Sequence, residues 1–288
     1  MNKILTVFST LLITTASLAI QAKSLTIDVY NADAQSFHVN ASVIYGDKEA
    51  IVVDTGFTKA DALRIAAKVL DSGKTLKTIF ISQADPDYYF GAETLVKLFP
   101  QAKVLTTAKV HAKIKATMAG KVAYWGEKMG ENAPITPVLP EILQADELSL
   151  EGHTIEIHGT AGALAHRPYL YIPDNKAVVG NVAIFNDLHV WLADTQTSAS
   201  VNAWLAQLKE IAALSPATVV PGHMKKGVKM DASAISYTAT YIEKFIAAKQ
   251  TAKNGDALIK TMTTQYPTAG LNIALAIGAK VHTGEMKW

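Results

Sequence analysis

The chain has 288 residues, of which 49% are hydrophobic and 18% are charged, and its formal net charge is +2. A chain of this length and apolar content can bury a large core, and it lacks the polar composition of a disordered protein. Its lysines are spread along the sequence, which indicates neither a basic nucleic-acid-binding groove nor a basic membrane-binding helix. We therefore expect a globular protein without a nucleic-acid partner, whereas the composition does not indicate its oligomeric state.

The N-terminal residues have the pattern of a secretory signal peptide. Lys3 provides a short positive region, and residues 4–20 are apolar and rich in Leu, Thr, Ser and Ala. Small residues such as Ala22 offer a cleavage point. We expect residues 1–22 to be removed and residues 23–288 to form a single domain, periplasmic or secreted. The absence of cysteine fits a bacterial periplasm, and no other segment is apolar enough over about 18 residues to be membrane-embedded.

Strand and helix patterns alternate through the first half of the chain. Short apolar, β-branched runs predict strands at residues 25–30, 38–45, 50–54 and 77–82. Apolar residues at helical spacing predict helices at residues 58–70, 93–99 and 108–119, the first of them capped by Thr58. Residues 127–141 are rich in Pro and Gly, which is typical of a loop that covers a pocket. Open α/β folds place their sites where such strands end.

The second half begins with strands and ends with helices. Strands are predicted at residues 148–157 and 169–173. An amphipathic helix is predicted at residues 198–214, capped by Ser198 or Ser200, and further helices at residues 232–249, 255–266 and 269–282. The sequence leaves open whether this helical extension, from about residue 230 to 288, packs on the domain edge, forms a lid or makes a dimer contact.

The most informative segment is residues 82–91, which read Ser-Gln-Ala-Asp-Pro-Asp-Tyr-Tyr-Phe-Gly between a predicted strand and a predicted helix. This segment resembles the signature of the metallo-β-lactamase fold hydrolases, Thr/Ser-His-x-His-x-Asp-His-x-x-Gly. Asp87 and Gly91 match the signature. Gln83, Asp85 and Tyr88 stand where it has histidine.

Four other landmarks occur in the same order along the chain as in the family, one before this segment and three after it. Residues 54–56 read Asp-Thr-Gly after a strand, and His223 is kept in Pro-Gly-His. Asn181 replaces the aspartate that would bridge two metals, and Ala163 replaces the histidine of a Gly-His-Thr segment. The resemblance covers roughly residues 25–225. It implies the α/β (α+β) class and an αββα sandwich of the metallo-β-lactamase fold, here with extra C-terminal helices.

The resemblance also implies which residues would face the two metals. The first metal's three histidines align with Gln83, Asp85 and Ala163. The second metal's ligands align with Asp87, Tyr88, Asn181 and His223. An amide is a poor zinc ligand, and a phenol loses its proton only near pH 10. We therefore expect a degraded dizinc site and no cofactor.

A rebuilt site for one divalent ion remains an alternative. Oxygen and imidazole donors such as those of Asp85, Asp87, Asn181 and His223 would suit Mg, Mn or Ca. Asp87 would be the catalytic residue of such a site. His166, which lies three residues after Ala163, is a candidate replacement for the lost histidine.

Each candidate residue also has a structural interpretation. Asp85 and Asp87 flank Pro86 and would suit a turn without a metal. Asp54 is expected to anchor the neighbouring loop. The aromatic rings of Tyr88 and Tyr89 would either fill the volume of the lost metal site or stack on a ligand. His166, with Arg167 beside it, and His189 are predicted on loops near the same edge, where each histidine would be a general base, a ligand-orienting group or neither.

Two functions are therefore compared. The favoured hypothesis is an exported metallo-β-lactamase-fold protein that is not a zinc hydrolase and is retained to bind a small ligand or a partner. The predicted ligand-binding residues are Gln83, Asp85, Asp87, Tyr88, Tyr89, His166, Asn181, His189 and His223. The alternative is an active hydrolase of esters, lactones or amides with a single-metal site. The fold is shared by many chemistries, so the sequence does not identify the substrate.

Overall fold

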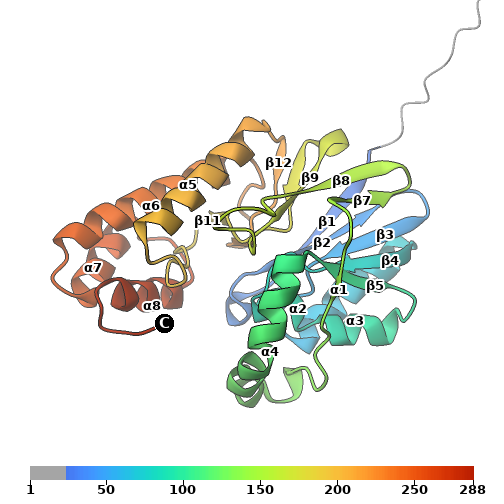
Figure 1. Cartoon of the computed structure of the whole chain (residues 1–288), viewed down its shortest axis with the longest axis horizontal. Helices are drawn as coiled ribbons and strands as arrows, with labels where there is room; N and C mark the ends of the chain where they lie inside the picture. Colours follow the sequence, from blue (N-terminus) through green and yellow to red (C-terminus); the bar gives the residue numbers. More distant parts are fainter. Residues whose placement is uncertain (1–23) are drawn as a thin grey trace, which may run out of the picture.

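The computed structural model describes residues 24–288, and the expected signal peptide lies outside the described residues. Two β-sheets pack face to face, with helices α1 to α4 on one side and helices α5 to α8 on the other (Figure 1). This arrangement confirms the predicted αββα sandwich with extra C-terminal helices.

The first sheet has six strands in the order β1-β2-β3-β4-β5-β6. The bounds are β1 Thr26–Asn31, β2 Asn40–Tyr45, β3 Glu49–Val53, β4 Thr75–Phe80, β5 Lys103–Thr106 and β6 Glu141–Ile142. Strands β1 to β3 are antiparallel, and β3 to β6 are parallel. The helices on this side are α1 Lys59–Ser72, α2 Pro86–Tyr89, α3 Ala92–Leu98 and α4 Ala108–Met129.

The second sheet has five strands in the order β12-β10-β9-β8-β7. The bounds are β7 Glu147–Leu150, β8 His153–His158, β9 Tyr169–Ile172, β10 Ala177–Val179 and β12 Thr218–Val219. A short parallel pair, β11 Phe185–Asn186 and β13 His223–Met224, forms a separate two-stranded sheet and carries His223.

Strand β3 shows why the sandwich forms. Ile51 and Val53 point into the core between the two sheets, whereas Ala50 and Val52 point into the core beneath helix α1. A strand buried on both faces reads as a continuous apolar run, as this one does. Burial of each large aliphatic side chain contributes about 1.5–3 kcal/mol, so both layers stabilise the strand.

The C-terminal helices are α5 Ser198–Ala213, α6 Ser233–Thr251, α7 Gly255–Gln265 and α8 Asn272–His282. Their apolar faces share one core with the outer face of the second sheet, through buried side chains such as Trp204, Phe245, Met262 and Leu275. The extension is therefore packed on the sandwich. Within residues 24–288, no helix combines the length and apolar character needed to span a membrane.

Several element predictions need correction. Residues 148–157 form two strands joined by a turn at Glu151-Gly152, where both residues have positive φ (51° and 86°). Helix α5 is capped by Thr197, in a capping box with Ser200, and neither Ser198 nor Ser200 is the cap. Helix α4 extends to Met129, ten residues beyond its predicted end, because no proline interrupts it. The Thr58 cap of α1 is confirmed.

Candidate functional site

The site lies at one edge of the sandwich, where several strands end. Asp54 follows β3, Gln83 follows β4 and Asn181 follows β10, while His223 begins β13. The Tyr88 hydroxyl is 3.0 Å from His223 Nε2 and 3.3 Å from the Asn181 carbonyl oxygen. The structure therefore brings together residues that are up to 169 positions apart in sequence, from Asp54 to His223.

Asp54 holds the loop that follows β4. Its carboxylate accepts hydrogen bonds from the Ser82 backbone N–H at 2.8 Å and the Ser82 hydroxyl at 2.7 Å. Burial raises the pKa of Asp54 to about 7, although these hydrogen bonds act in the opposite direction. Asp54 also has a positive φ of 65°, which is uncommon for a residue other than glycine. The anchoring role expected for Asp54 agrees with these contacts.

Gly91 fixes the other end of the loop. A Cβ atom at this position would lie 2.0 Å from the Thr55 carbonyl oxygen, so no larger residue fits without backbone movement. The Thr55 backbone N–H and hydroxyl both donate to the Tyr88 carbonyl oxygen, at 2.8 and 3.0 Å. The short helix α2, which carries Asp87 and Tyr88, is thus tied directly to the end of β3.

His223 is held as a neutral imidazole. Its Nδ1 donates to the Phe37 carbonyl oxygen at 2.9 Å, which leaves Nε2 as an acceptor for the Tyr88 hydroxyl. Burial lowers the pKa of His223 to about 4. The Phe185 ring stacks on the imidazole with centroids 4.9 Å apart. The nitrogen that would bind a metal is therefore used by a phenol.

Asp87 lies beside this pair but is not an ion-pair partner. Its Oδ2 is 3.6 Å from His223 Nε2, which is within ion-pair range. Burial, followed by the charge of Asp85, raises the pKa of Asp87 to about 8, so the carboxyl is protonated at neutral pH. Because both groups are neutral, the contact carries no salt-bridge energy.

Asp85 is paired with an ammonium group. Lys121, on helix α4, lies 2.9 Å from Asp85 Oδ1 and donates to the Ala84 carbonyl oxygen at 2.7 Å. Burial favours the protonated carboxyl, but Lys121 outweighs it and the pKa of Asp85 is lowered. A side chain of the protein thus supplies the positive charge that a metal ion would bring to Asp85.

The two amides of the predicted site bind backbone. Gln83 Nε2 donates to the Pro168 carbonyl oxygen at 2.9 Å. Asn181 Nδ2 donates to the Val220 carbonyl oxygen at 2.9 Å, and its Oδ1 accepts from the Ile184 N–H at 3.0 Å. Both side chains tie loops together, and the Asn181 side-chain oxygen is used by the Ile184 N–H.

Tyr89 and His189 lie elsewhere. Tyr89 packs in the core between the first sheet and helices α1, α3 and α4, and its buried hydroxyl has no hydrogen-bond partner in the described chain. His189 is buried, and its Nδ1 lies 2.9 Å from the Tyr241 hydroxyl of helix α6. The first residue fills the core and the second joins a loop to the C-terminal helices.

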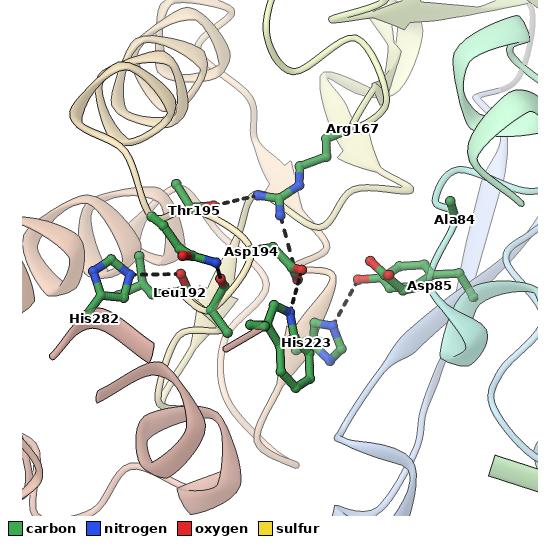
Figure 2. A network of polar contacts seen from close by, with 12 residues as sticks. Ala84, Asp85, Arg167, Leu192, Asp194, Thr195, His223 and His282 are labelled. Carbon is green, nitrogen blue, oxygen red and sulfur yellow. Dashed lines mark hydrogen bonds and ion pairs between the residues drawn. The ribbon is translucent and has the colours of Figure 1, made fainter. Parts of the chain in front are cut away.

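His166 is half-buried close to several charged side chains. Burial lowers its pKa to about 4, and the positive charges of Lys113 and Arg167 act in the same direction. His166 is therefore neutral at the edge of the site. Figure 2 shows Arg167, Asp85 and His223 converging on this region from different parts of the chain.

Lys113 and Lys121 are site residues that the sequence does not predict, whereas Arg167 is the neighbour of His166 on the loop predicted near the site. Arg167 Nη1 donates to Thr195 Oγ1 at 3.1 Å, and its Nη2 lies 3.9 Å from Asp194 Oδ2 (Figure 2). The two lysines are eight positions apart on helix α4, which places them on one helix face. This spacing is the one sequence pattern that indicates a pair of lysines on a common helix face. No motif of the family includes this helix, so the pattern alone does not place the lysines at the site.

The donors present do not fit the two metals of the family. Among residues 24–288, no group of three or more His, Asp, Glu or Cys side chains is arranged to hold a metal ion. A catalytic zinc needs about three protein ligands and an open position. Asp85, Asn181 and His223 are each bonded within the protein, so the candidates for a single-ion site are not gathered around one point either.

Two surface grooves, of about 290 and 280 Å³, lie between helices α5 and α6. Val201, Asn202, Ile246 and Gln250 line both of them. No predicted site residue lines either groove.

The chain has the metallo-β-lactamase fold, as its sandwich, its Asp54 anchor, its Asp87-to-Gly91 segment and its retained His223 indicate. The profile of the metallo-beta-lactamase superfamily matches residues 35–223, and the chain belongs to that superfamily. No curated protein sequence matches the chain.

Similar solved structures share the fold over most of the chain. A metallo-beta-lactamase family protein from Thermus thermophilus is 17% identical with a TM-score of 0.64, over 91% of this chain and 92% of that chain. A beta-lactamase domain protein from Burkholderia ambifaria is 13% identical with a TM-score of 0.60, over 90% and 84%. A metallo-beta-lactamase from Pontibacter korlensis is 17% identical with a TM-score of 0.55, over 77% and 96%. At these identities the likeness establishes the fold alone.

Proposed function

We propose that this chain binds a small molecule at the edge of the sandwich and does not carry out zinc-dependent hydrolysis. The observation that carries the proposal is the 3.0 Å contact between the Tyr88 hydroxyl and His223 Nε2. This hydrogen bond occupies Nε2 of His223, the one histidine ligand of the family site that this chain retains. The pairing of Asp85 with Lys121 supports the same conclusion, because an ammonium already neutralises that carboxylate.

The chemistry of the remaining groups also disfavours hydrolysis. A metal entering the site would have to remove the proton of Asp87 and displace the phenol of Tyr88 from His223. Burial, followed by the charge of Asp87, raises the pKa of Tyr88 well above its ordinary value, so this phenol does not become a phenolate ligand at neutral pH. If the alternative single-metal hydrolase were correct, Asp87 would be its catalytic carboxyl.

The test is the metal content of the purified protein. We expect elemental mass spectrometry, after dialysis against trace zinc, manganese, magnesium and calcium, to give well under one ion per chain. Asp87→Ala and His223→Ala should leave this value unchanged. His158→Ala is the matched control, because His158 is a half-buried histidine whose Nε2 lies 2.7 Å from Glu156.

One ion per chain that is lost in Asp87→Ala and in His223→Ala, but kept in His158→Ala, would overturn the proposal. That result would favour the single-metal hydrolase and call for ester, lactone and amide screens with the metal found. Metal lost equally from all three variants would point to surface binding and would leave the proposal standing.

We further propose that the protein is exported. Its support is the positive and apolar N-terminal pattern of residues 1–22. Expression of the full sequence in a bacterial host, followed by fractionation and mass determination, should give a periplasmic protein shortened near Ala22. An uncleaved cytoplasmic protein would contradict this proposal without affecting the one on ligand binding.

A further inference from the structure

Arg167 is a buried cation whose hydrogen-bonding capacity is largely unused. Its residue exposure is 7%, and a guanidinium has five N–H donors. In the described chain, one hydrogen bond uses them, from Nη1 to Thr195 Oγ1. The 3.9 Å distance from Nη2 to Asp194 is too long for a hydrogen bond. The remaining donor nitrogens are not among the fully buried unpaired atoms of the described chain, so they reach solvent and are open to an acceptor.

The position of Arg167 is fixed from two sides. Gln207 Nε2 of helix α5 donates to the Arg167 carbonyl oxygen at 2.9 Å, and Gln83 Nε2 donates to the carbonyl oxygen of Pro168 at 2.9 Å. The guanidinium carbon also lies 5.4 Å from the centre of the Trp204 ring. A rigid backbone and an aromatic support hold the planar donor group ready for an acceptor.

Lys113 brings a second cation without a counter-ion. It lies on helix α4 two turns before Lys121 and is half-buried. Within residues 24–288, Lys113 makes no ion pair. The nearby carboxylates already face other cations, since Asp85 pairs with Lys121 and Asp194 faces Arg167. Burial lowers the pKa of Lys113, and Asp85, Arg167, Asp194 and Lys121 all act on it. These five groups are therefore within electrostatic reach of one another.

The charges in this cluster do not balance. Lys113, Lys121 and Arg167 carry three positive charges, whereas Asp85 and Asp194 carry two negative ones. An oxyanion would supply the missing negative charge and accept the unused hydrogen bonds.

Aromatic side chains border the cations. Trp125, one turn beyond Lys121 on helix α4, packs edge-on against Phe37 with ring centroids 5.5 Å apart. Trp191 lies 6.4 Å from Phe37 and 5.6 Å from Trp288, whose indole N–H donates to Asp194 at 2.8 Å. Trp125 and Trp191 are half-buried. The aromatic rings thus form a continuous row from helix α4, next to Lys121, to the Asp194 carboxylate that faces Arg167.

Resting on the proposed ligand-binding function, we propose that Arg167 and Lys113 bind the carboxylate or phosphate group of a small organic ligand whose apolar part lies against Trp125 and Trp191. Arg167 offers a fork of two parallel donors, which matches either oxyanion. Asp194 is the group that the ligand displaces. The oxyanion of the ligand would therefore replace the Asp194 carboxylate, which lies 3.9 Å from Arg167 Nη2, as the negative group facing the guanidinium.

Calorimetric titration of the purified full chain tests this assignment. The probes are benzoate, phenyl phosphate, inorganic phosphate and benzamide, which has the shape of benzoate without its charge. We expect benzoate or phenyl phosphate to bind and benzamide not to bind. Arg167→Gln and Lys113→Met should each weaken binding about tenfold or more, because each removes a charged hydrogen-bond donor.

Lys115→Met is the matched control, since Lys115 is exposed on the same helix and has the same charge. It should change affinity by less than about twofold. If Arg167→Gln fails to fold by circular dichroism, the half-buried Lys113 carries the test alone. Binding of phenyl phosphate but not benzoate, or the reverse, identifies which oxyanion the site takes.

Three results would overturn the assignment. They are no binding of either organic anion, equal weakening by Lys115→Met and Lys113→Met, and binding of inorganic phosphate alone. None of them bears on metal content, so a metal-free protein that ignores these anions would refute the anion site and leave the proposed function intact. A protein that holds one ion through Asp87 and His223 would refute the proposed function directly.

Discussion

Two parts of the site differ in how closely they follow the family motifs. One is the backbone frame, meaning the loop contacts made by Asp54, Ser82 and Gly91, and the other is the set of side chains at the metal-ligand positions. Asp54, Ser82 and Gly91 match the signature and make the contacts that shape the loop. Gln83, Asp85 and Tyr88 stand in place of histidine and bond to other parts of the protein instead. The frame depends on close packing and buried hydrogen bonds, which the fold needs whether or not a metal binds. Donor side chains can change without loss of the fold when new partners satisfy them.

Restoring one histidine gives the largest expected effect. Tyr88→His would place an imidazole beside Asp87 and His223, which makes three donors, the number a catalytic zinc needs. If the frame still holds the donor geometry, this variant should bind one zinc per chain with a Kd on the order of 1 µM or tighter, equivalent to about 8 kcal/mol. Elemental mass spectrometry after dialysis measures it.

Tyr88→Phe is the control for that variant, because it frees His223 Nε2 without adding a ligand. Zinc bound by both variants would mean that the phenol alone keeps metal out. Zinc bound by neither variant would show that the backbone has lost the metal-site geometry as well as the donors. It would contradict the view that only the donor side chains have changed.

The frame itself is tested at Gly91. In Gly91→Ala the new Cβ would meet the Thr55 carbonyl oxygen at 2.0 Å, and backbone cannot yield as a flexible side chain does. We expect the free energy of unfolding to fall by about 3 kcal/mol, at the upper end of overpacking effects. Gly120→Ala in helix α4 is the control, since nothing lies within 4 Å of its Cβ. It should stabilise by about 0.5–1 kcal/mol, because glycine disfavours helix. Urea denaturation compares the two, and equal effects would contradict the account of the frame.

The sequence predicts the frame better than the site, and particular residues show why. The αββα sandwich follows from apolar runs such as residues 50–54 and from the motif landmarks, which are local patterns. Lys121, Lys113 and Arg167 come from a helix and a loop outside every landmark, and only tertiary packing brings them to Asp85 and Asp194. His189 and Tyr89 were predicted near the site because of their sequence neighbours. Their side chains instead pack against α6 and into the first-sheet core.

Protonation of Asp87 gives a smaller, pH-dependent effect. Between the ordinary pKa of aspartate and about 8, the folded protein keeps a proton that the unfolded chain has released, so raising the pH favours unfolding. His223, whose pKa is lowered to about 4, acts in the opposite direction, but only below pH 6.5. Asp54, whose pKa is raised to about 7, acts in the same direction as Asp87 in the lower part of this range. Stability should therefore fall by about 2 kcal/mol between pH 6.5 and pH 8, mostly through Asp87.

Asp87→Asn should remove most of this loss, because the amide has no proton to release. Asp146→Asn, at an exposed carboxylate, should leave the loss unchanged. Denaturation curves at the two pH values measure the difference. A wild-type protein that is more stable at pH 8 than at pH 6.5 would mean that Asp87 is ionised in the folded protein. An ionised Asp87 would be available as a metal ligand, which would weaken the case against a metal site.

The smallest effect concerns Asp194, which connects the donor side chains to the proposed anion site. Asp194→Asn removes the negative charge facing Arg167 but keeps an oxygen that can accept the Trp288 indole N–H. Because Asp194 is partly exposed and lies 3.9 Å from the guanidinium, its attraction is screened by solvent and worth less than about 1 kcal/mol. Removing a competitor of that strength should raise affinity for benzoate or phenyl phosphate by about twofold to fivefold. Calorimetric titration of Asp194→Asn against Asp146→Asn separates this effect from a general loss of negative charge. A decrease in affinity would show that Asp194 positions Arg167 for the anion and does not compete with it.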